Sequence, residues 1–557
     1  MFKQAVFICL FFLLIGCGGG DSNSTTEITP TPEPPAPVAP TPSPIVIAPE
    51  IIRADASRLL SQATFGANLV DIDLVEKIGV EAWIDQQINL QPTSHLDYIF
   101  QIDDETIWHD ERFEAWFDTA ITSPDQLRQR VAFALSEILV VSDNSAIGDY
   151  VEAMANYYDI LVDNAFGNYR TLLEKVTLSP VMGSYLSMLG NEKPNVSRNI
   201  RPDENYAREA MQLFSIGLVE LNIDGSEKLI NGAPIPTYDL DIIKGFAHVF
   251  TGWNFNGTTE QTWKRPEIVP LLPMTAVEEF HDKSEKILLN NFVVPAEQSA
   301  YQDLTMALDN IFAHDNVAPF ISRQLIQRLV TSNPSPEYIA RIAGIFNDNG
   351  DGVKGDLAKV IKAILLDDEA RNGFKNFPTI FGKIREPLIK ATHLWRAFNA
   401  SSPNNRFQLA WPLDPLAQAP LSAPSVFNFF SPNYRPPSEV LADNIVAPEL
   451  QLMTESTITK LTNYMAYSTL WGHVDAGENN QQDDRILIDV SPWLSLTDDP
   501  QTLVEQLDLV LTASTMSDEM KTILVDFYQE DIWSEDREKV LDLLFLIVSS
   551  PQYAVQK

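Results

Sequence analysis

The sequence predicts a mainly α-helical protein, a large multi-helix globular domain with a small irregular or β-hairpin insertion. Apolar residues recur at helical spacing in most long segments after residue 52, strand-type alternation is sparse, and no internal repeat of fixed period is visible. Of the 557 residues, 45% are apolar, which is enough for a large core and excludes disorder as the dominant state.

The first residues are typical of a bacterial secretory signal. Lys3 precedes an apolar run from Ala5 to Ile15, which is too short to span a bilayer comfortably. The run ends in LIGC, which resembles the lipobox of bacterial lipoproteins, where a peptidase cuts before a cysteine that is then acylated. We therefore expect residues 1–16 to be a lipoprotein signal peptide and Cys17 to be the lipidated residue. An ordinary signal peptide with an incidental cysteine is the alternative.

The segment 17–51 is predicted to be a disordered Pro/Thr-rich linker between the lipidated cysteine and a helical domain over 52–557. Nine prolines lie between Pro30 and Pro49, and such a composition favours extended conformations and cannot form a core. Gly18 stands where an inner-membrane retention signal would place Asp. The sequence thus indicates a protein of the bacterial cell envelope, lipid-anchored in the outer membrane.

Charge and cysteine content exclude several classes. There are 76 acidic and 39 basic residues, a formal charge of −37, so a nucleic-acid partner is excluded because phosphate binding needs a cationic face. Both cysteines lie within the first 17 residues, so the domain that follows holds neither a disulfide nor a Cys-ligated zinc site.

The clearest predicted helix follows Ser123-Pro124-Asp125-Gln126, where Ser123 is expected to cap, Pro124 to take the first helical position and Gln126 to complete a capping box. Its apolar residues form one stripe in LRQRVAFALSEILVV, at 127–141. The same periodicity predicts helices over 154–166, 168–178, 316–330, 336–346, 356–367 and 539–550.

Strand signals gather in one region, an expected insertion at 219–300. Asn231-Gly232 lies within 219–237, and Asn256-Gly257 lies within 255–294; each dipeptide favours a tight hairpin turn. A Pro-rich loop is expected near 400–440.

Most standard cofactor and metal-binding motifs are absent from the sequence or incomplete. The GxGxxG at 350–355 follows a predicted helix, whereas a dinucleotide site needs a strand, and no P-loop, GxSxG or HExxH is present, so no cofactor is expected. Asn347, Asn349 and Asp351 match the first ligands of a calcium loop, but position 12 is Ala358 in place of the bidentate Glu. They are weak metal candidates, and the other interpretation is a polar turn between helices.

Two groups of residues are candidates for acid–base chemistry. His281 and Asp282, followed by Lys286, concentrate titratable types in the insertion, where they form either a reactive loop or a solvated one. Glu204, Arg208 and Glu209 share the polar arc of a helix expected from Pro202, which is either a salt-bridged surface or one wall of a cleft.

Several ordered blocks carry a resemblance to a known family. They are RLLSQATFG at 58–66, LRQRVAFALSEILVVS at 127–142, ENYAREAMQLFSIGL at 204–218, FTGWNF at 250–255, GDLAKVIKAILLDDEAR at 355–371, GKIREP at 382–387 and PSVFNFFSPNY at 424–434. Together they resemble the bacterial DUF1800 family over about residues 53–553. The resemblance implies a predominantly helical, often exported protein without an established activity. It also implies a possible partner, an exported protein similar to sulfatases and alkaline phosphatases.

Two functions remain open. The first is an envelope-anchored binding or accessory module for a partner protein or an extracellular polymer, which fits the tether and the failure of catalytic templates. The second is a hydrolase of polysaccharide or ester substrates, with Glu204 or Glu209 acting beside His281 or Asp282.

Overall fold

The computed structural model describes residues 49–102, 107–409, 412–437, 445–472 and 485–557. It divides the chain into two units, Met1–Ile47 and Ala48–Lys557, and the described helices belong to the second. The expected signal peptide at 1–16, Cys17 and most of the expected linker at 17–51 lie outside the described residues and stay predictions.

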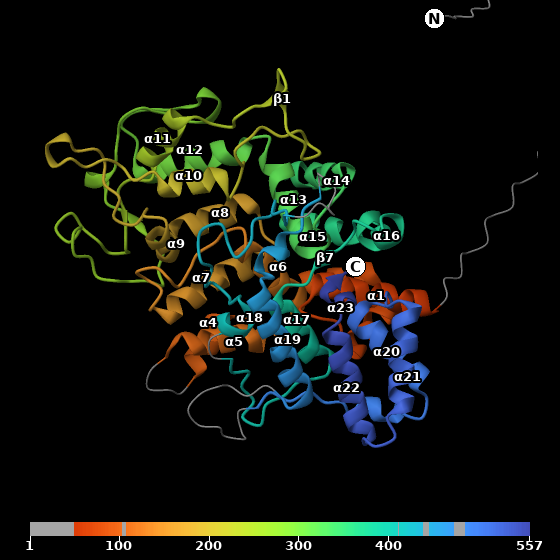
Figure 1. The fold of residues 1–557 in the computed structure, drawn as a ribbon. Coiled ribbons are helices and arrows are strands. Elements are labelled where there is room, and N and C mark those ends of the chain that lie inside the picture. Colours follow the sequence, from red (N-terminus) through yellow and green to blue (C-terminus); the bar gives the residue numbers. More distant parts are fainter. Residues whose placement is uncertain (1–48, 103–106, 410–411, 438–444, 473–484) are drawn as a thin grey trace, which may run out of the picture. The chain divides into compact units, whose positions relative to one another are not determined.

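The second unit is mainly α-helical, as the sequence predicts (Figure 1). Its α-helices are α1 Pro49–Ala63, α2 Leu69–Ile78, α3 Val80–Ile88, α4 His95–Gln101, α5 His109–Thr122, α6 Gln126–Ser136, α7 Val151–Asn164, α8 Tyr169–Leu178, α9 Pro180–Tyr185, α10 Asn205–Gln212, α11 Leu240–Val249, α12 Ala300–Ala313, α13 Val317–Leu329, α14 Pro336–Asn347, α15 Leu357–Leu366, α16 Asp368–Asn376, α17 Pro387–Ala397, α18 Leu413–Leu416, α19 Glu455–Leu470, α20 Pro500–Thr512, α21 Asp518–Glu530, α22 Asp536–Val548 and α23 Pro551–Ala554. Short 3₁₀ helices are η1 Val196–Arg198, η2 Glu278–Phe280, η3 Leu289–Asn291, η4 Pro448–Leu452 and η6 Ser491–Leu496.

The strands are short and pair two by two, all antiparallel. The pairs are β1 Leu229–Ile230 with β2 Ala233–Pro234, β3 Trp253–Asn254 with β4 Thr275–Ala276, β5 Lys286–Ile287 with β6 Val293–Val294, and β7 Lys383–Ile384 with β8 Val555–Gln556. The hairpin at Asn231-Gly232 is confirmed. The stretch 255–294 also carries a short hairpin, β5–β6, as the sequence predicts. Its turn does not lie at Asn256-Gly257: the residues after that dipeptide are mostly polar and exposed, and β3 pairs with the distant β4.

The predicted start of the helix after Ser123 is wrong by two residues. α6 begins at Gln126, and Asp125 takes the N-cap position. The Asp125 carboxylate accepts hydrogen bonds from the Thr93 backbone N–H at 3.0 Å and from the Thr93 hydroxyl at 2.7 Å. We attribute the later start to this long-range contact, which a local capping pattern does not contain.

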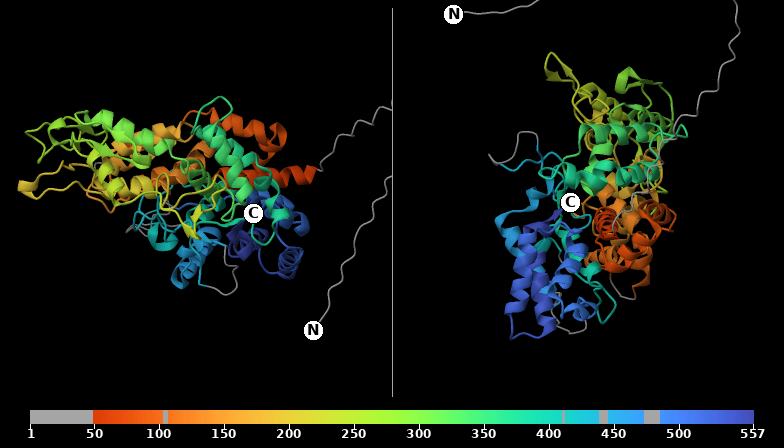
Figure 2. Two further views of the ribbon diagram at one scale, coloured as in Figure 1. Left: turned by 90° about the horizontal axis from the view of Figure 1, so that it is seen from above. Right: turned by 90° about the vertical axis from the view of Figure 1, so that its right-hand side faces the viewer.

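α6 and α17 lie at the centre of this unit, since every residue of both helices is buried. Segments that are distant in sequence close around them. α1 contacts α20, where the Ser57 hydroxyl donates to the Leu509 carbonyl at 2.6 Å, and Figures 1 and 2 show the red helix beside the blue ones. The C-terminal strand β8 pairs Gln556 with Lys383, and its Gln556 amide donates to the Leu329 carbonyl at 2.8 Å. The C-terminal strand β8 thus contacts both α13 and the segment that begins at Lys383.

Within the described ranges, no helix is both long and apolar enough to cross a bilayer.

Candidate functional site

A cavity of about 440 Å³ lies against α13 and is called the α13 pocket below. Its walls come from the segment after α6, the segment after α10 and the loop at 426–433. Phe320, Gln324 and Arg328 line it from α13 at a spacing of four residues, which places their side chains along one face of the helix. Half of the lining residues are aliphatic or Phe, including Leu213, Leu218 and Val426, and eight are polar or charged.

Three buried polar side chains also line the α13 pocket. Glu137, Gln324 and Arg328 are 4%, 7% and 3% exposed. Each has a buried atom without a hydrogen-bond partner: Glu137 Oε2, Gln324 Nε2 and Arg328 Nε. A buried polar atom left unpaired costs about 1 to 3 kcal/mol, so three of them on one cavity indicate a place where a ligand or ordered water completes the bonding.

Behind the α13 pocket lies a set of charged side chains that we call the buried ionic cluster. All of its members are nine-tenths or more buried. It consists of the cations Arg130, Arg328 and Lys383 and the carboxyl groups of Glu137, Glu386 and Glu449.

Two cations of the buried ionic cluster meet at the C-terminal end of α13. Arg130 Nη2 and Lys383 Nζ donate to the Arg328 carbonyl at 2.6 and 2.8 Å. Cations are favoured there because the last helical carbonyls carry partial negative charge. Lys383 Nζ also lies 3.2 Å from both Glu386 Oε1 and Glu449 Oε1, so one ammonium group joins two carboxylates.

The carboxyl groups of the cluster differ in their ionisation. Burial and the nearby charge of Glu386 raise the pKa of Glu137 to about 8. Burial also raises the pKa of Glu449. Burial works to raise the pKa of Glu386 as well, but the charges of Lys383 and Arg130 lower it overall. Near neutral pH Glu137 therefore holds a proton while Glu386 is ionised.

The loop that closes the cluster from the other side has unusual backbone geometry. Ala417, Leu421 and Asn428 have φ values of +54°, +54° and +63°. For Ala and Leu this left-handed region costs on the order of 1 kcal/mol or more. The strained backbone presents the Gln418 amide to Glu386 Oε2 at 2.7 Å and the Asn428 amide to Glu137 Oε1 at 3.2 Å. Between them lies a cavity of about 10 Å³, enough for about one water molecule.

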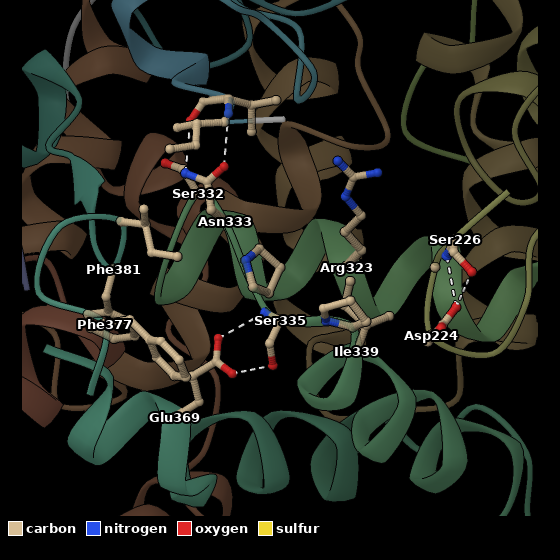
Figure 3. A pocket seen from close by; sticks show the side chains of 16 residues that line it. Asp224, Ser226, Arg323, Ser332, Asn333, Ser335, Ile339, Glu369, Phe377 and Phe381 are labelled. Carbon is tan, nitrogen blue, oxygen red and sulfur yellow. Dashed lines mark hydrogen bonds between the residues drawn. The ribbon is translucent and has the colours of Figure 1, made fainter. Parts of the chain in front are cut away.

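A second cavity, of about 340 Å³, adjoins the α13 pocket and shares Arg323 and Gly225 with it. Figure 3 shows bonds within its lining: Asn333 exchanges two hydrogen bonds with Val446, and Glu369 accepts from Ser335. Among the described residues that line it, none has a buried polar atom without a partner. The chemistry therefore points to the α13 pocket.

The structure separates the three candidates on the polar arc of α10. Glu204 and Arg208 form a half-exposed ion pair at 3.3 Å, with exposed fractions of 36% and 41%. Glu209 is buried, its Oε2 has no hydrogen-bond partner, and burial raises its pKa. Glu204 and Arg208 therefore lie on the protein surface, whereas Glu209 lies in the interior. None of the three lines the cavities described above.

His281 and Asp282 lie in the interior and bond to different partners. His281 is fully buried between Asp303, at 3.1 Å from its Nε2, and the Thr251 carbonyl, at 3.0 Å from its Nδ1. Lys286 Nζ lies 2.6 Å from the same Asp303 carboxylate. Asp282 bonds to the partly exposed His248; burial works to raise the pKa of Asp282, but the bond to His248 lowers it well below its usual range.

The weak metal candidates lie at the turn after α14. Asn347 ends the helix, and the Asn349 side-chain oxygen accepts from the backbone N–H groups of Asp351 and Val353 at 2.9 and 3.2 Å. Across the described residues, no cluster of three or more His, Cys, Asp or Glu side chains is arranged to hold a metal ion. The loop thus bonds to its own backbone. A helix precedes the GxGxxG, as the sequence predicts.

Sequence reasoning missed the buried ionic cluster, although two signals point to it. Arg130 and Glu137 interrupt the apolar segment of α6, and Lys383 and Glu386 fall in the short block GKIREP. Charged residues within otherwise buried segments require partners. Which charges meet depends on the tertiary fold, since the members come from four separate segments of the chain.

The chain was compared with known families, proteins and structures. The profile of the family described as "Protein of unknown function (DUF1800)" matches residues 58–555. No curated protein matches the chain, and no solved structure matches it either. The blocks of the buried ionic cluster and of the α13 pocket lie inside the matched range. Because the match spans nearly the whole chain, the protein belongs to the DUF1800 family.

Proposed function

We propose that this protein is a binding module whose α13 pocket takes a small amphiphilic molecule, with an apolar body and a polar end. One observation carries the proposal: an apolar cavity of about 440 Å³ has three unpaired, buried polar atoms among its lining residues. Ligand pockets commonly combine apolar walls with a few placed polar groups. No Trp or Tyr lines the cavity, and half of its lining residues are aliphatic or Phe, which favours an amphiphilic ligand over a sugar polymer.

The proposal is tested by the fluorescence of N-phenyl-1-naphthylamine, a neutral apolar probe that brightens on leaving water. Titration into the full chain should give saturable binding. Leu218→Trp should weaken it at least about tenfold, because the larger side chain fills the pocket. Leu218 is 57% exposed, so the substitution is compatible with folding.

Leu240→Trp is the matched control. Leu240 is 54% exposed and lines none of the cavities described above. This variant should bind the probe like the wild type. Equal weakening by both substitutions, or no saturable binding by the wild type, contradicts the proposal.

Hydrolysis is the second candidate, and one observation favours it: Glu209 is a buried carboxyl group with a raised pKa, a property shared by many general acids. Both ring nitrogens of His281 are engaged, which leaves no free nitrogen for proton transfer with Glu209. The binding role is therefore the better supported of the two.

We also propose that Cys17 is lipidated and that the linker tethers the helical domain in the bacterial envelope, at the outer membrane. The LIGC sequence and the nine prolines support this location. A partner protein, such as an exported sulfatase- or phosphatase-like protein, or an extracellular polymer stays a prediction. Co-purification from the native envelope followed by mass spectrometry tests it.

A further inference from the structure

The geometry points to a carboxylate subsite at the inner end of the α13 pocket, formed by Gln324 Nε2, Arg328 Nε and the Glu137 carboxyl group. This inference rests on the proposed function and names the polar end of the ligand. The ligand class is a monocarboxylic acid with an apolar chain, the carboxylate facing the buried ionic cluster and the chain lying along the apolar walls.

The first support is the geometry of the unpaired atoms. Arg328 Nε lies 3.7 Å from Glu137 Oε2, and neither atom has a hydrogen-bond partner. The other guanidinium nitrogens are occupied: Nη1 donates to the Gln324 carbonyl at 3.3 Å and Nη2 to the Glu137 carbonyl at 2.9 Å. The backbone thus fixes the guanidinium while its Nε–H stays free to donate. Gln324 Nε2 supplies a second free donor.

The second support is charge. Arg130, Arg328 and Lys383 face Glu386 and Glu449, so a protonated Glu137 leaves the buried ionic cluster with an excess of positive charge. A buried excess charge is costly, and a ligand carboxylate reduces it.

The proton on Glu137 makes the subsite sensitive to pH. The groups that face this carboxyl are Arg130 on its own helix, Arg328 on α13, Lys383 in β7, Glu386 at the start of α17, Glu449 in η4 and the Asn428 amide. Burial and Glu386 raise the pKa of Glu137 to about 8. Below that pH the carboxyl group is neutral, shares its proton with Glu386 and does not repel a ligand carboxylate, and above it the ionised group repels one. Binding should therefore weaken as the pH rises through that value.

The test compares decanoate with decan-1-ol, which have the same chain length and different ends, by calorimetry on the full chain. At about pH 7, decanoate should bind at least about tenfold more tightly than the alcohol, since hydrogen bonds to a charged group contribute more than neutral ones. At about pH 9.5 this preference should largely vanish, although decanoate is ionised at both pH values.

Two variants and one control sharpen the test. Gln324→Leu should reduce the preference for decanoate and leave the alcohol nearly unaffected. Glu137→Gln should keep the preference at both pH values, because the amide donates without titrating. Gln501→Leu changes an exposed amide that lines none of the cavities described above, and it should behave like the wild type.

The outcomes separate the inference from the proposed function. If decanoate and decan-1-ol bind equally at about pH 7, the carboxylate subsite is wrong while the apolar pocket stands. If neither binds, the proposed function fails as well. Tighter binding of decyl phosphate than of decanoate overturns the assignment to a carboxylate.

Discussion

Arg328 and Glu137 contact each other in two ways, one a hydrogen bond and the other a longer contact between the side chains. Arg328 Nη2 donates to the Glu137 backbone carbonyl at 2.9 Å, whereas Arg328 Nε and Glu137 Oε2 face each other at 3.7 Å without a hydrogen bond. The first contact fixes the guanidinium, and the second leaves two polar atoms unpaired where both residues line the α13 pocket. A direct hydrogen bond between Arg328 Nε and Glu137 Oε2 would pair both atoms within the protein. In the observed arrangement both atoms stay unpaired and can bond to a ligand.

Glu137→Gln should remove a pH dependence of stability. The pKa of Glu137 is about 8 in the folded protein and about 4.3 in an unfolded chain. Between these values the folded state holds a proton that the unfolded state releases, so the free energy of unfolding falls as pH rises through that window. Gln mimics the protonated carboxyl, so the variant should match the wild type near pH 5 and melt at a higher temperature near pH 9, as measured by calorimetric scans across this range.

Other groups with raised pKa, such as Glu209 and Glu449, titrate in the wild type and in the Glu137→Gln variant alike. The difference between their melting temperatures at each pH therefore reports on Glu137. A constant difference at all pH values would contradict the assignment of the proton to Glu137.

Lys383→Met should destabilise the protein strongly, because Lys383 joins the buried carboxylates of Glu386 and Glu449. Removal of one partner from a buried ion pair costs on the order of 3 to 5 kcal/mol. Lys460→Met is the matched control: Lys460 and Asp414 form an exposed pair, which is worth about 0 to 1 kcal/mol. Urea denaturation measures both. If the two variants lose similar free energy, the cluster does not stabilise the fold as described.

The sequence predicts the helices well because their signals are local. The Asn231-Gly232 turn needs only a few neighbouring residues, and it agrees with the structure. The helix expected over 127–141 forms, but it ends at Ser136 and is buried on every face and not along one stripe only. The start of α6 could not be predicted, since Thr93 binds Asp125 from a distant segment.

The site is less predictable from sequence. Glu137 shares a segment with Leu135 and Ile138. Burial raises its pKa most, and Glu386, the charged group that raises it further, lies far along the chain. Helical periodicity predicts that Glu209 lies on a polar arc, yet Glu209 is buried in the structure. A helix face with polar residues can still pack against other elements.

Arg208→Ala should leave the free energy of unfolding within about 1 kcal/mol of the wild type, since exposed ion pairs contribute little. Glu209→Gln should leave stability unchanged or raise it near pH 8, because an amide is cheaper to bury than an unpaired carboxylate. Urea denaturation of both variants is the measurement. A large loss in Arg208→Ala would show a buried role that its 41% exposed side chain does not indicate.

Cys17→Ala should release the protein from membranes or leave its signal peptide uncleaved, because acylation needs the thiol. A clickable palmitate analogue fed to the producing cells should label the wild type alone. Equal labelling of wild type and variant would contradict lipidation at Cys17.

The central claim is that the α13 pocket binds an amphiphile with its carboxylate at the buried end. A crystal structure of the chain with 10-bromodecanoate tests it most directly, because anomalous scattering locates the bromine. We expect the bromine near the apolar residues Leu218 and Val426, and the carboxylate within hydrogen-bond distance of Gln324 Nε2 and Arg328 Nε. An anomalous peak outside the pocket, or a carboxylate directed away from Arg328, would contradict the claim.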